Sequence, residues 1–161
     1  MIRPARPEDA PALAALLNHW IETTAITFNP VPKTPDDILG LILSKAAAGH
    51  AFLVAEDGGR VIGQASYGQF RAGPGYRTCM EHSISLLPGT HGKGLGRTLL
   101  AAVEDHARAG GAHQMIAAVS GENADGRAFH ARMGYAHVAT IPEAGHKFGR
   151  FMDLVLMQKF L

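Results

Sequence analysis

The chain has 161 residues, of which 47% are hydrophobic and 18% are charged, and its formal net charge at pH 7 is +1. This is the length of one domain, which we place at 1–161, and it is enough to bury a substantial core. A near-neutral chain without a cluster of lysines and arginines makes nucleic acid and membranes poor candidates for partners.

Cysteine and histidine usage narrows the chemistry further. Cys79 is the only cysteine, which rules out an intrachain disulfide and favours a reducing compartment, so we expect a cytoplasmic protein. We find no signal-peptide pattern and no apolar run of about 18 residues, so we expect neither export nor a transmembrane helix. None of the nine histidines stands in an H-x-x-x-H pattern, and we expect no metal.

Hydrophobic spacing and turn residues predict the secondary structure in chain order. In the first half, strands are predicted at 2–5, 51–55, 61–70 and 79–87. One helix is predicted to begin at 6–9, and a second to run from Asp36-Asp37 to residue 48. The second half predicts helices at 95–109 and 123–133, and strands at 114–120, 135–141 and 150–160. This order predicts an α/β fold with a mixed, mostly antiparallel sheet and helices on both faces.

The stretch His91-Gly92-Lys93-Gly94-Leu95-Gly96 stands between a predicted strand and a predicted helix. Glycines at such a turn leave backbone N–H groups at the positive end of the helix dipole, which indicates an anion site and a phosphate ligand. The spacing fits neither a P-loop nor a dinucleotide fingerprint, because Lys93 is followed by glycine and the next strand carries no acid. A tight turn without a ligand is the remaining alternative.

Four segments resemble one enzyme family. Positions 91–96 match the acetyl-CoA loop R/Q-x-x-G-x-G/A of the Gcn5-related N-acetyltransferases, except that His91 replaces Arg or Gln. Asn18 to Thr24 with Phe28, Glu81-His82-Ser83, and Gly145 to Leu154 resemble the phosphinothricin and methionine sulfoximine N-acetyltransferases. The resemblance covers nearly the whole chain. It implies that a homodimer transfers acetyl from acetyl-CoA to the α-amino group of a small amino acid or analogue.

Glu81 is the candidate base. It shares a polar strand face with Ser83 and Ser85, where a carboxylate could take the amine's proton through water. A structural carboxylate paired with Arg71 or Arg77 is an equally good interpretation of the position alone, and the family resemblance favours the base.

His130 is the second candidate catalytic residue. The resemblance places it where this family has a histidine and many other acetyltransferases have a tyrosine that protonates the CoA thiolate. Its ordinary pKa near neutrality suits a proton donor. The alternative is a histidine on a partly buried helix face. Cys79 is interpreted as structural, because nothing near it in the sequence favours a thiolate.

The binding residues follow from the loop and from the resemblance. The expected acetyl-CoA contacts are the strand edge Ile84, Ser85 and Leu86, the loop residues His91, Gly92, Lys93, Gly94, Leu95, Gly96 and Arg97, and Asn123. Asn123 has the alternative role of a helix N-cap. The expected acceptor contacts are Phe28, Arg71, Ala72, Gly73, Tyr76 and Lys147. Ala72-Gly73 replaces a Pro-aromatic pair that is frequent in the family.

Two other functions stay open on the sequence. The acceptor could be another amine, such as a polyamine, an aminoglycoside or a protein N-terminus. The domain could also be a non-catalytic sensor that binds acyl-CoA, although the presence of both Glu81 and His130 argues against it.

Overall fold

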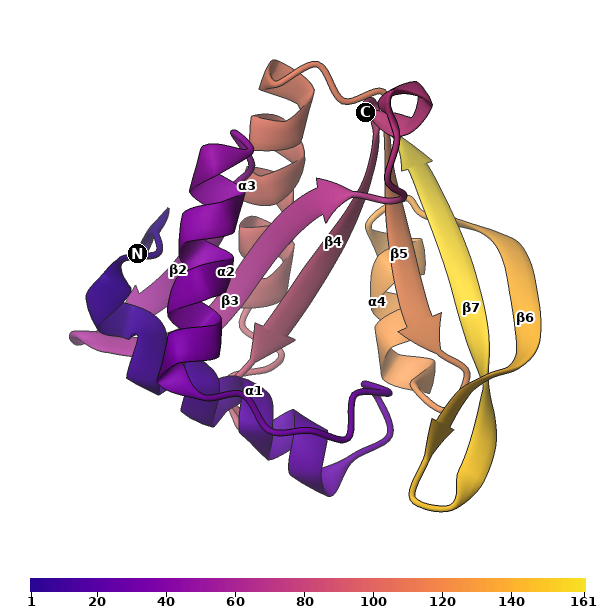
Figure 1. The fold of residues 1–161 in the computed structure, drawn as a ribbon, viewed down its shortest axis with the longest axis horizontal. Helices are drawn as coiled ribbons and strands as arrows, with labels where there is room; N and C mark the ends of the chain where they lie inside the picture. Colours follow the sequence, from indigo (N-terminus) through magenta and orange to yellow (C-terminus); the bar gives the residue numbers. More distant parts are fainter.

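A computed structural model describes residues 1–161 and shows one seven-stranded sheet in the order β1-β2-β3-β4-β5-β7-β6, with helices on both faces (Figure 1). The strands are β1 (Ile2–Pro4), β2 (Phe52–Asp57), β3 (Arg60–Gln69), β4 (Cys79–Leu86), β5 (Gln114–Ser120), β6 (Ala136–Lys147) and β7 (Arg150–Phe160). The helices are α1 (Ala10–Thr23), α2 (Pro35–Ala47), α3 (Leu95–Ala109) and α4 (Ala124–Arg132), with short 3-10 helices at Pro7–Asp9 and Pro74–Tyr76. The expected fold class is confirmed.

The parallel pair β4–β5 is the exception in an otherwise antiparallel sheet. These two strands pair only over Cys79–Glu81 and Gln114–Ile116. Beyond these residues the strands diverge, and Figure 1 shows the space that opens between them. A split therefore interrupts the centre of the sheet, with one closed end and one open end.

Two apolar clusters hold the helices on the sheet. Leu13 of α1 and Ile38 of α2 are fully buried in a cluster with β2 and β3 on one face. Leu99 and Val103 of α3 are fully buried with Met115 of β5 in the larger cluster on the other face. Burying each such side chain contributes about 1.5–3 kcal/mol, so both layers are firmly attached to the sheet.

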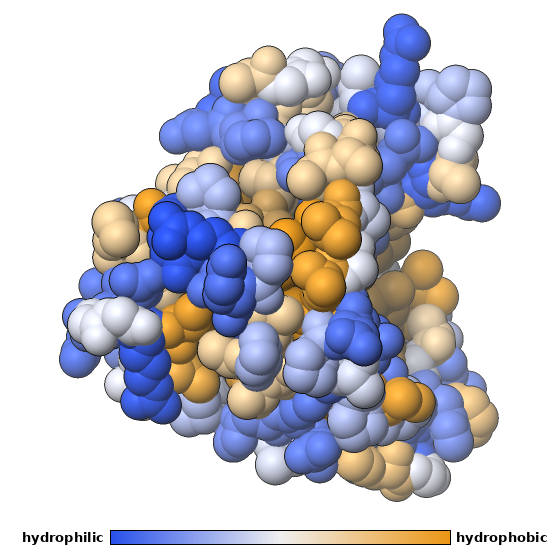
Figure 2. All heavy atoms as spheres, turned by 60° about the vertical axis from the view of Figure 1, so that its left-hand side comes forward, coloured by the Kyte–Doolittle hydropathy of each residue, from blue (hydrophilic) through white to orange (hydrophobic).

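On the face shown in Figure 2, hydrophilic side chains surround small and separate apolar groups. None of the helices combines the length and the apolar character that crossing a bilayer requires.

Strand β6 is longer than the sequence predicts, because it continues from 141 to Lys147. The stretch 142–145 contains proline and glycine and has the composition of a turn, but it is accommodated as an irregularity in the register with β7. There Glu143 has a φ of 55°, and its N–H donates to Asp153 Oδ1 at 3.0 Å. The side-chain acceptor stabilises this irregular backbone, so the pairing resumes afterwards.

The start of α1 also differs from the expectation. Residues Pro7–Asp9 form a 3-10 turn, and the α-helix begins at Ala10. The Asp9 carboxylate accepts hydrogen bonds from Arg3 at 2.7 and 2.9 Å and from the Arg6 N–H at 2.7 Å. This ion pair fixes the tight turn before the helix.

Candidate active site

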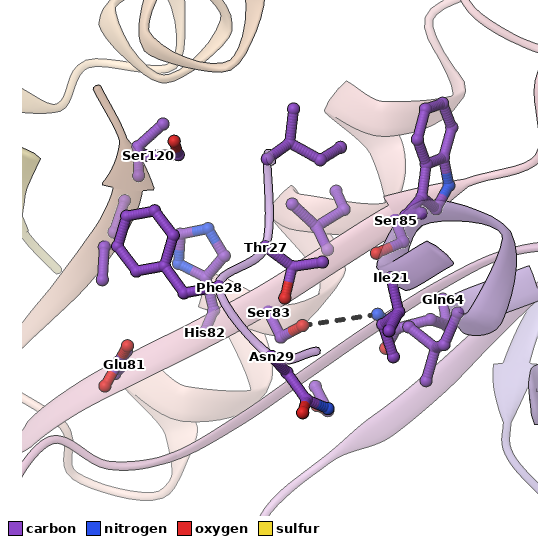
Figure 3. A pocket seen from close by; sticks show the side chains of 18 of the residues that line it. Ile21, Thr27, Phe28, Asn29, Gln64, Glu81, His82, Ser83, Ser85 and Ser120 are labelled. Atoms are coloured by element: carbon purple, nitrogen blue, oxygen red, sulfur yellow. Dashed lines mark hydrogen bonds between the residues drawn. The ribbon is translucent and has the colours of Figure 1, made fainter. Parts of the chain in front are cut away.

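A cavity of about 760 Å³ occupies the split and the space between the sheet and the α1–α2 layer. Strands β4 and β5 contribute its floor, and the loop after α1 contributes Thr27, Phe28 and Asn29 (Figure 3). Glu81 and Ser83 project from β4 into this space in the same view. The cavity therefore extends from the closed end of the split towards its open end.

On the edge of β4 that faces the split, alternate residues have backbone N–H and C=O groups that are not used in pairing with β3. At the two ends of the strand, Phe70 N donates to Cys79 O and Leu87 N donates to Ile62 O, each at 2.9 Å. Antiparallel pairing alternates between bonded and non-bonded residue pairs, so the even-numbered residues from 82 to 86 turn their N–H and C=O groups towards β5. The last paired residue of β4 is Glu81, opposite Ile116, and beyond this pair β5 has diverged, so the backbone groups of Ile84 have no partner on β5.

Of the three strand-edge residues expected to contact the cofactor, Ile84 has this free edge. The Leu86 carbonyl accepts the Trp20 indole N–H at 2.9 Å, so its position is already occupied. Ser85 lies opposite Gln64, and the same alternation directs its backbone groups to β3. The Ser85 side chain lines the cavity.

The glycine loop leads into an uncapped helix. Gly92 and Gly94 have φ values of 83° and 77°, a region that favours glycine. No side chain caps α3 at Gly94, and no acid stands in its first turn. The first backbone bond is from Thr98 N to Gly94 O at 3.1 Å, so the N–H groups of 95–97 have no acceptor within the helix.

Helices α2 and α4 begin in the opposite way. Thr34 and Asp37 form a reciprocal capping box at the start of α2. Asn123 Oδ1 accepts the Gly126 N–H at 2.9 Å at the start of α4, so the alternative role of Asn123 as an N-cap is present in the structure. Asn123 also lines the cavity. Unlike α2 and α4, helix α3 leaves its first amides for an anionic ligand.

Glu81 is partly buried and faces the α2 side of the cavity. It lies opposite Gly68 of β3, and no hydrogen bond or ion pair involves its carboxylate. Burial raises the pKa of Glu81, and the Lys45 ammonium lowers it in opposition. Neither Arg71 nor Arg77 forms an ion pair with it, so the structural pairing weighed above is absent.

His82 and His130 form a buried pair that sequence reasoning missed. Their Nε2 atoms are 2.9 Å apart, and His130 Nδ1 lies 2.7 Å from the Gly126 carbonyl oxygen. A carbonyl can only accept, so His130 carries its proton on Nδ1, and its Nε2 accepts the His82 Nε2–H. His82 Nδ1 is then unprotonated, and it has no hydrogen-bond partner.

Both imidazoles of this pair are neutral. Burial, together with the charge that His130 would carry, lowers the pKa of His82 to about 3. Burial also lowers the pKa of His130, against an opposing contribution from its bond to Gly126. Because both ring nitrogens of His130 already have partners, this conformation directs none of its N–H groups at a ligand.

Lys147 lies in a different environment from the one expected of an acceptor contact. Its side chain is buried, and Nζ donates to the carbonyls of Thr24 at 2.7 Å and Thr27 at 2.9 Å. Phe28 follows in the same loop, and a Cβ at Gly145 would lie 2.5 Å from its ring. Gly145 and Lys147 therefore anchor the loop that places Phe28 at the cavity.

The other four expected acceptor contacts lie on the exposed connection between β3 and β4, and none of them lines the cavity. Gln69 Nε2 donates to the carbonyls of Arg71 and Gly73, each at 2.6 Å. The Arg71 guanidinium lies 5.5 Å from the centre of the Tyr76 ring. Ala72 is exposed beside them, so the connection is ordered by its own contacts.

Cys79 stays a structural residue in this geometry. Burial raises the pKa of its thiol, and the nearby Glu81 charge raises it further. The thiol form is therefore favoured, which fits direct transfer better than a covalent cysteine intermediate. The structure gathers no group of three His, Cys, Asp or Glu side chains that could hold a metal ion.

The chain has relatives of known name over nearly its full length. Residues 14–135 match the model of the acetyltransferase (GNAT) family. The L-amino acid N-acyltransferase MnaT of Escherichia coli is 38% identical over 98% of this chain and 91% of the relative. The L-methionine sulfoximine/L-methionine sulfone acetyltransferase of Salmonella typhimurium is 38% identical over 98% of this chain and 92% of its own.

Solved structures agree with this grouping. A GNAT superfamily phosphinothricin acetyltransferase from Sinorhizobium meliloti, in complex with acetyl-CoA, has a TM-score of 0.95 and 29% identity, with coverage of 100% of this chain and 88% of that one. A ribosomal-protein-alanine N-acetyltransferase from Brucella melitensis has a TM-score of 0.96 and 37% identity, with coverage of 100% and 99%.

Proposed function

The chain belongs to the acetyltransferase (GNAT) family, and on that premise we propose that it acetylates the α-amino group of a small amino acid or analogue of the methionine sulfoximine or phosphinothricin type. Acetyl-CoA is the acetyl donor. The observation that carries the proposal is the split itself, which runs from an uncapped helix N-terminus to a partly buried carboxylate with no partner.

The donor side of the reaction uses backbone groups. The free amides at 95–97 and the positive end of α3 bind the pyrophosphate. The N–H and C=O of Ile84 bind the pantetheine arm along the edge of β4. The chemistry that acetyl-CoA supplies is a thioester carbonyl that can be attacked by an amine.

Glu81 acts as the base on the acceptor side. It takes one proton from the substrate ammonium through water, and the free amine then attacks the thioester carbonyl. A new C–N bond forms and the C–S bond breaks, and the nitrogen gives its second proton to the water that protonates the departing thiolate. The departing thiolate takes a proton from water rather than from His130, because both nitrogens of that ring are already paired. His130 is then a positioning residue.

A panel of acceptors tests this function by the release of free thiol from acetyl-CoA. Methionine sulfoximine and phosphinothricin should give higher kcat/KM than spermidine, kanamycin or a peptide that begins with alanine. The peptide represents the second candidate function, which the likeness to the ribosomal-protein-alanine enzyme favours. A higher kcat/KM for any of these three would contradict the proposed acceptor, and acetyl-CoA binding without thiol release for any acceptor would indicate a sensor.

The proposal includes a homodimer in the cytoplasm. Its support is a group of exposed apolar side chains on the β6–β7 hairpin, namely Val138, Ile141, Phe148, Phe151 and Phe160. Apolar groups of this kind are typical of protein interfaces. Sedimentation equilibrium measures the mass in solution, and a monomer at micromolar concentration would contradict this part.

A further inference from the structure

Lys45 places an ammonium group inside the cavity. The amino-acid sequence alone did not identify this residue as part of the site. It stands in the last turn of α2, is partly buried, and lines the cavity wall. Its Nζ lies over Gly68 of β3, where a Cβ would come within 2.5 Å of it and within 3.9 Å of His50 Nδ1. The absence of a side chain at Gly68 is therefore what makes room for the cation.

This ammonium has no partner in the protein. No hydrogen bond or ion pair involves Lys45 Nζ, although other partly buried cations of the chain are paired. Arg3 contacts Asp9 and Glu56, and Lys159 contacts Glu104 at 2.6 Å. Burial lowers the pKa of Lys45, and the Glu81 charge opposes this effect. Leaving a partly desolvated charge unpaired is costly, which points to a ligand that completes it.

Lys45 also stands beside the candidate base. Gly68 pairs with Glu81 across β3 and β4, so the ammonium and the carboxylate share one face of the sheet. They do not form an ion pair, yet each charge shifts the pKa of the other, so the two groups are near each other without being paired. One negative and one positive group on the same wall form the complement of a zwitterion.

We propose that Lys45 binds the α-carboxylate of the acceptor while Glu81 faces its α-ammonium. This rests on the proposed function and names the residue that restricts it to free α-amino acids. The carboxyl carbon of an α-amino acid is two bonds from the nitrogen, so a cation next to the base is where that carboxylate lies. Polyamines and peptide N-termini lack an α-carboxylate and cannot complete the pair.

Lys45→Met tests the assignment, because it keeps the apolar stem and removes the charge. We compare methionine sulfoximine with the amine that lacks its carboxylate but is otherwise identical, reading thiol release. The variant should raise KM for methionine sulfoximine at least tenfold, with kcat changed less than threefold, and leave kcat/KM for the decarboxylated amine within twofold. Because burial lowers the pKa of Lys45 and the Lys45 charge in turn lowers that of Glu81, kcat and KM are measured over a range of pH, and the two proteins are compared on the plateau where Glu81 is deprotonated and Lys45 is still charged.

Three further variants sharpen the test. Lys45→Arg should recover most of the lost affinity. Gly68→Ala should cause a smaller loss of the same kind, because its Cβ would lie 2.5 Å from Nζ and the ammonium must shift from its place. Lys33→Met removes a second cation from the same cavity and should change the preference between the two acceptors less than threefold.

Equal losses on both acceptors, or no loss on either, would overturn the role of Lys45 while leaving the acetyltransferase intact. If the parent enzyme acetylated no free α-amino acid at all, the proposed function would fail together with this inference. The role of Lys45 is supported if the ratio of kcat/KM for methionine sulfoximine to kcat/KM for the decarboxylated amine falls in Lys45→Met and Gly68→Ala but not in Lys33→Met.

Discussion

The two ends of the split are built from different parts of the chain. At the open end, a short exposed loop presents backbone amides and glycines, and all of it comes from the segment 91–97. At the closed end, Lys45 of α2, Glu81 and His82 of β4, and His130 of α4 converge in partly or fully buried positions. The comparison teaches that the proposed phosphate site is local in sequence, whereas the proposed acceptor site forms only with the tertiary structure.

The two ends of the split also differ in the groups that determine their electrostatic potential. The structural evidence at the open end is a helix dipole and unpaired amides, which attract an anion without any buried charge. The closed end holds four groups whose pKa is shifted by burial. Perturbed groups in a cavity are typical of functional sites. Changes at the closed end should therefore affect chemistry, and changes at the open end should affect affinity for acetyl-CoA.

The largest expected effect is that of Glu81→Gln. Turnover should fall by roughly 10²–10⁴-fold, because that is the usual contribution of a general base, while acetyl-CoA binds as before. In the parent, burial raises the pKa of Glu81, so kcat/KM should fall as the pH drops through that raised value. Asp105→Asn, an exposed neutralisation on α3, is the matched control and should keep parental turnover. A near-normal kcat in Glu81→Gln would contradict the assignment of Glu81 as the general base.

His82→Gln should change how folding stability depends on pH. The folded pKa of about 3 lies below the unfolded value of 6.5, so the unfolded chain binds the extra proton between these limits. Stability from the neutral His82 is complete above pH 6.5 and is lost as the pH falls towards 3, with a slope of up to about 1.4 kcal/mol per pH unit. The variant should show a flatter decline in urea unfolding.

His91→Gln supplies the control from the open end, since His91 is exposed in the loop. The free energy of unfolding of this variant should depend on pH as it does in the parent. If both variants kept the parental slope, the buried neutral pair at the closed end would be refuted.

His130→Phe should have the smallest effect on the chemical step. A positioning residue predicts a deficit well below the 10²–10⁴-fold or so that a lost general acid would cause, and the same deficit at each pH. The measurement is kcat at saturating acetyl-CoA between about pH 6.5 and pH 9, since a free thiolate has a pKa near 8.5. A deficit at low pH that closes as the pH rises would assign the thiolate's proton to His130 after all.

Sequence reasoning reached the features that depend on local spacing. The alternation of β4 placed Glu81 and Ser83 on one face, and the glycine spacing located the turn before α3. Both follow from rules that operate within about ten residues, namely strand periodicity and the steric freedom of glycine. The split itself was not foreseen, because it depends on where β4 stops pairing with β5.

Residues that act across elements were missed or were given another role. Lys45 shows no local signal, because its importance comes from α2 lying over Gly68. His82 stood in a recognised motif, but its partner His130 is 48 positions away. The family resemblance around Lys147 implied a substrate contact, whereas in the structure its ammonium holds the loop before Phe28. Such contacts are set by packing between distant segments and leave no periodicity to detect.

Calorimetric titration of acetyl-CoA into Gly94→Val tests the contrast between the two ends most directly. Gly94 has a φ of 77°, and a β-branched residue is strained there, so the loop must change shape. Gly111→Val carries the same strain at a φ of 88° outside the loop and reports any general loss of folding. We expect Gly94→Val to weaken binding at least tenfold, while Gly111→Val and Glu81→Gln bind as the parent does. Equal affinity in Gly94→Val and Gly111→Val would contradict a backbone-built cofactor site.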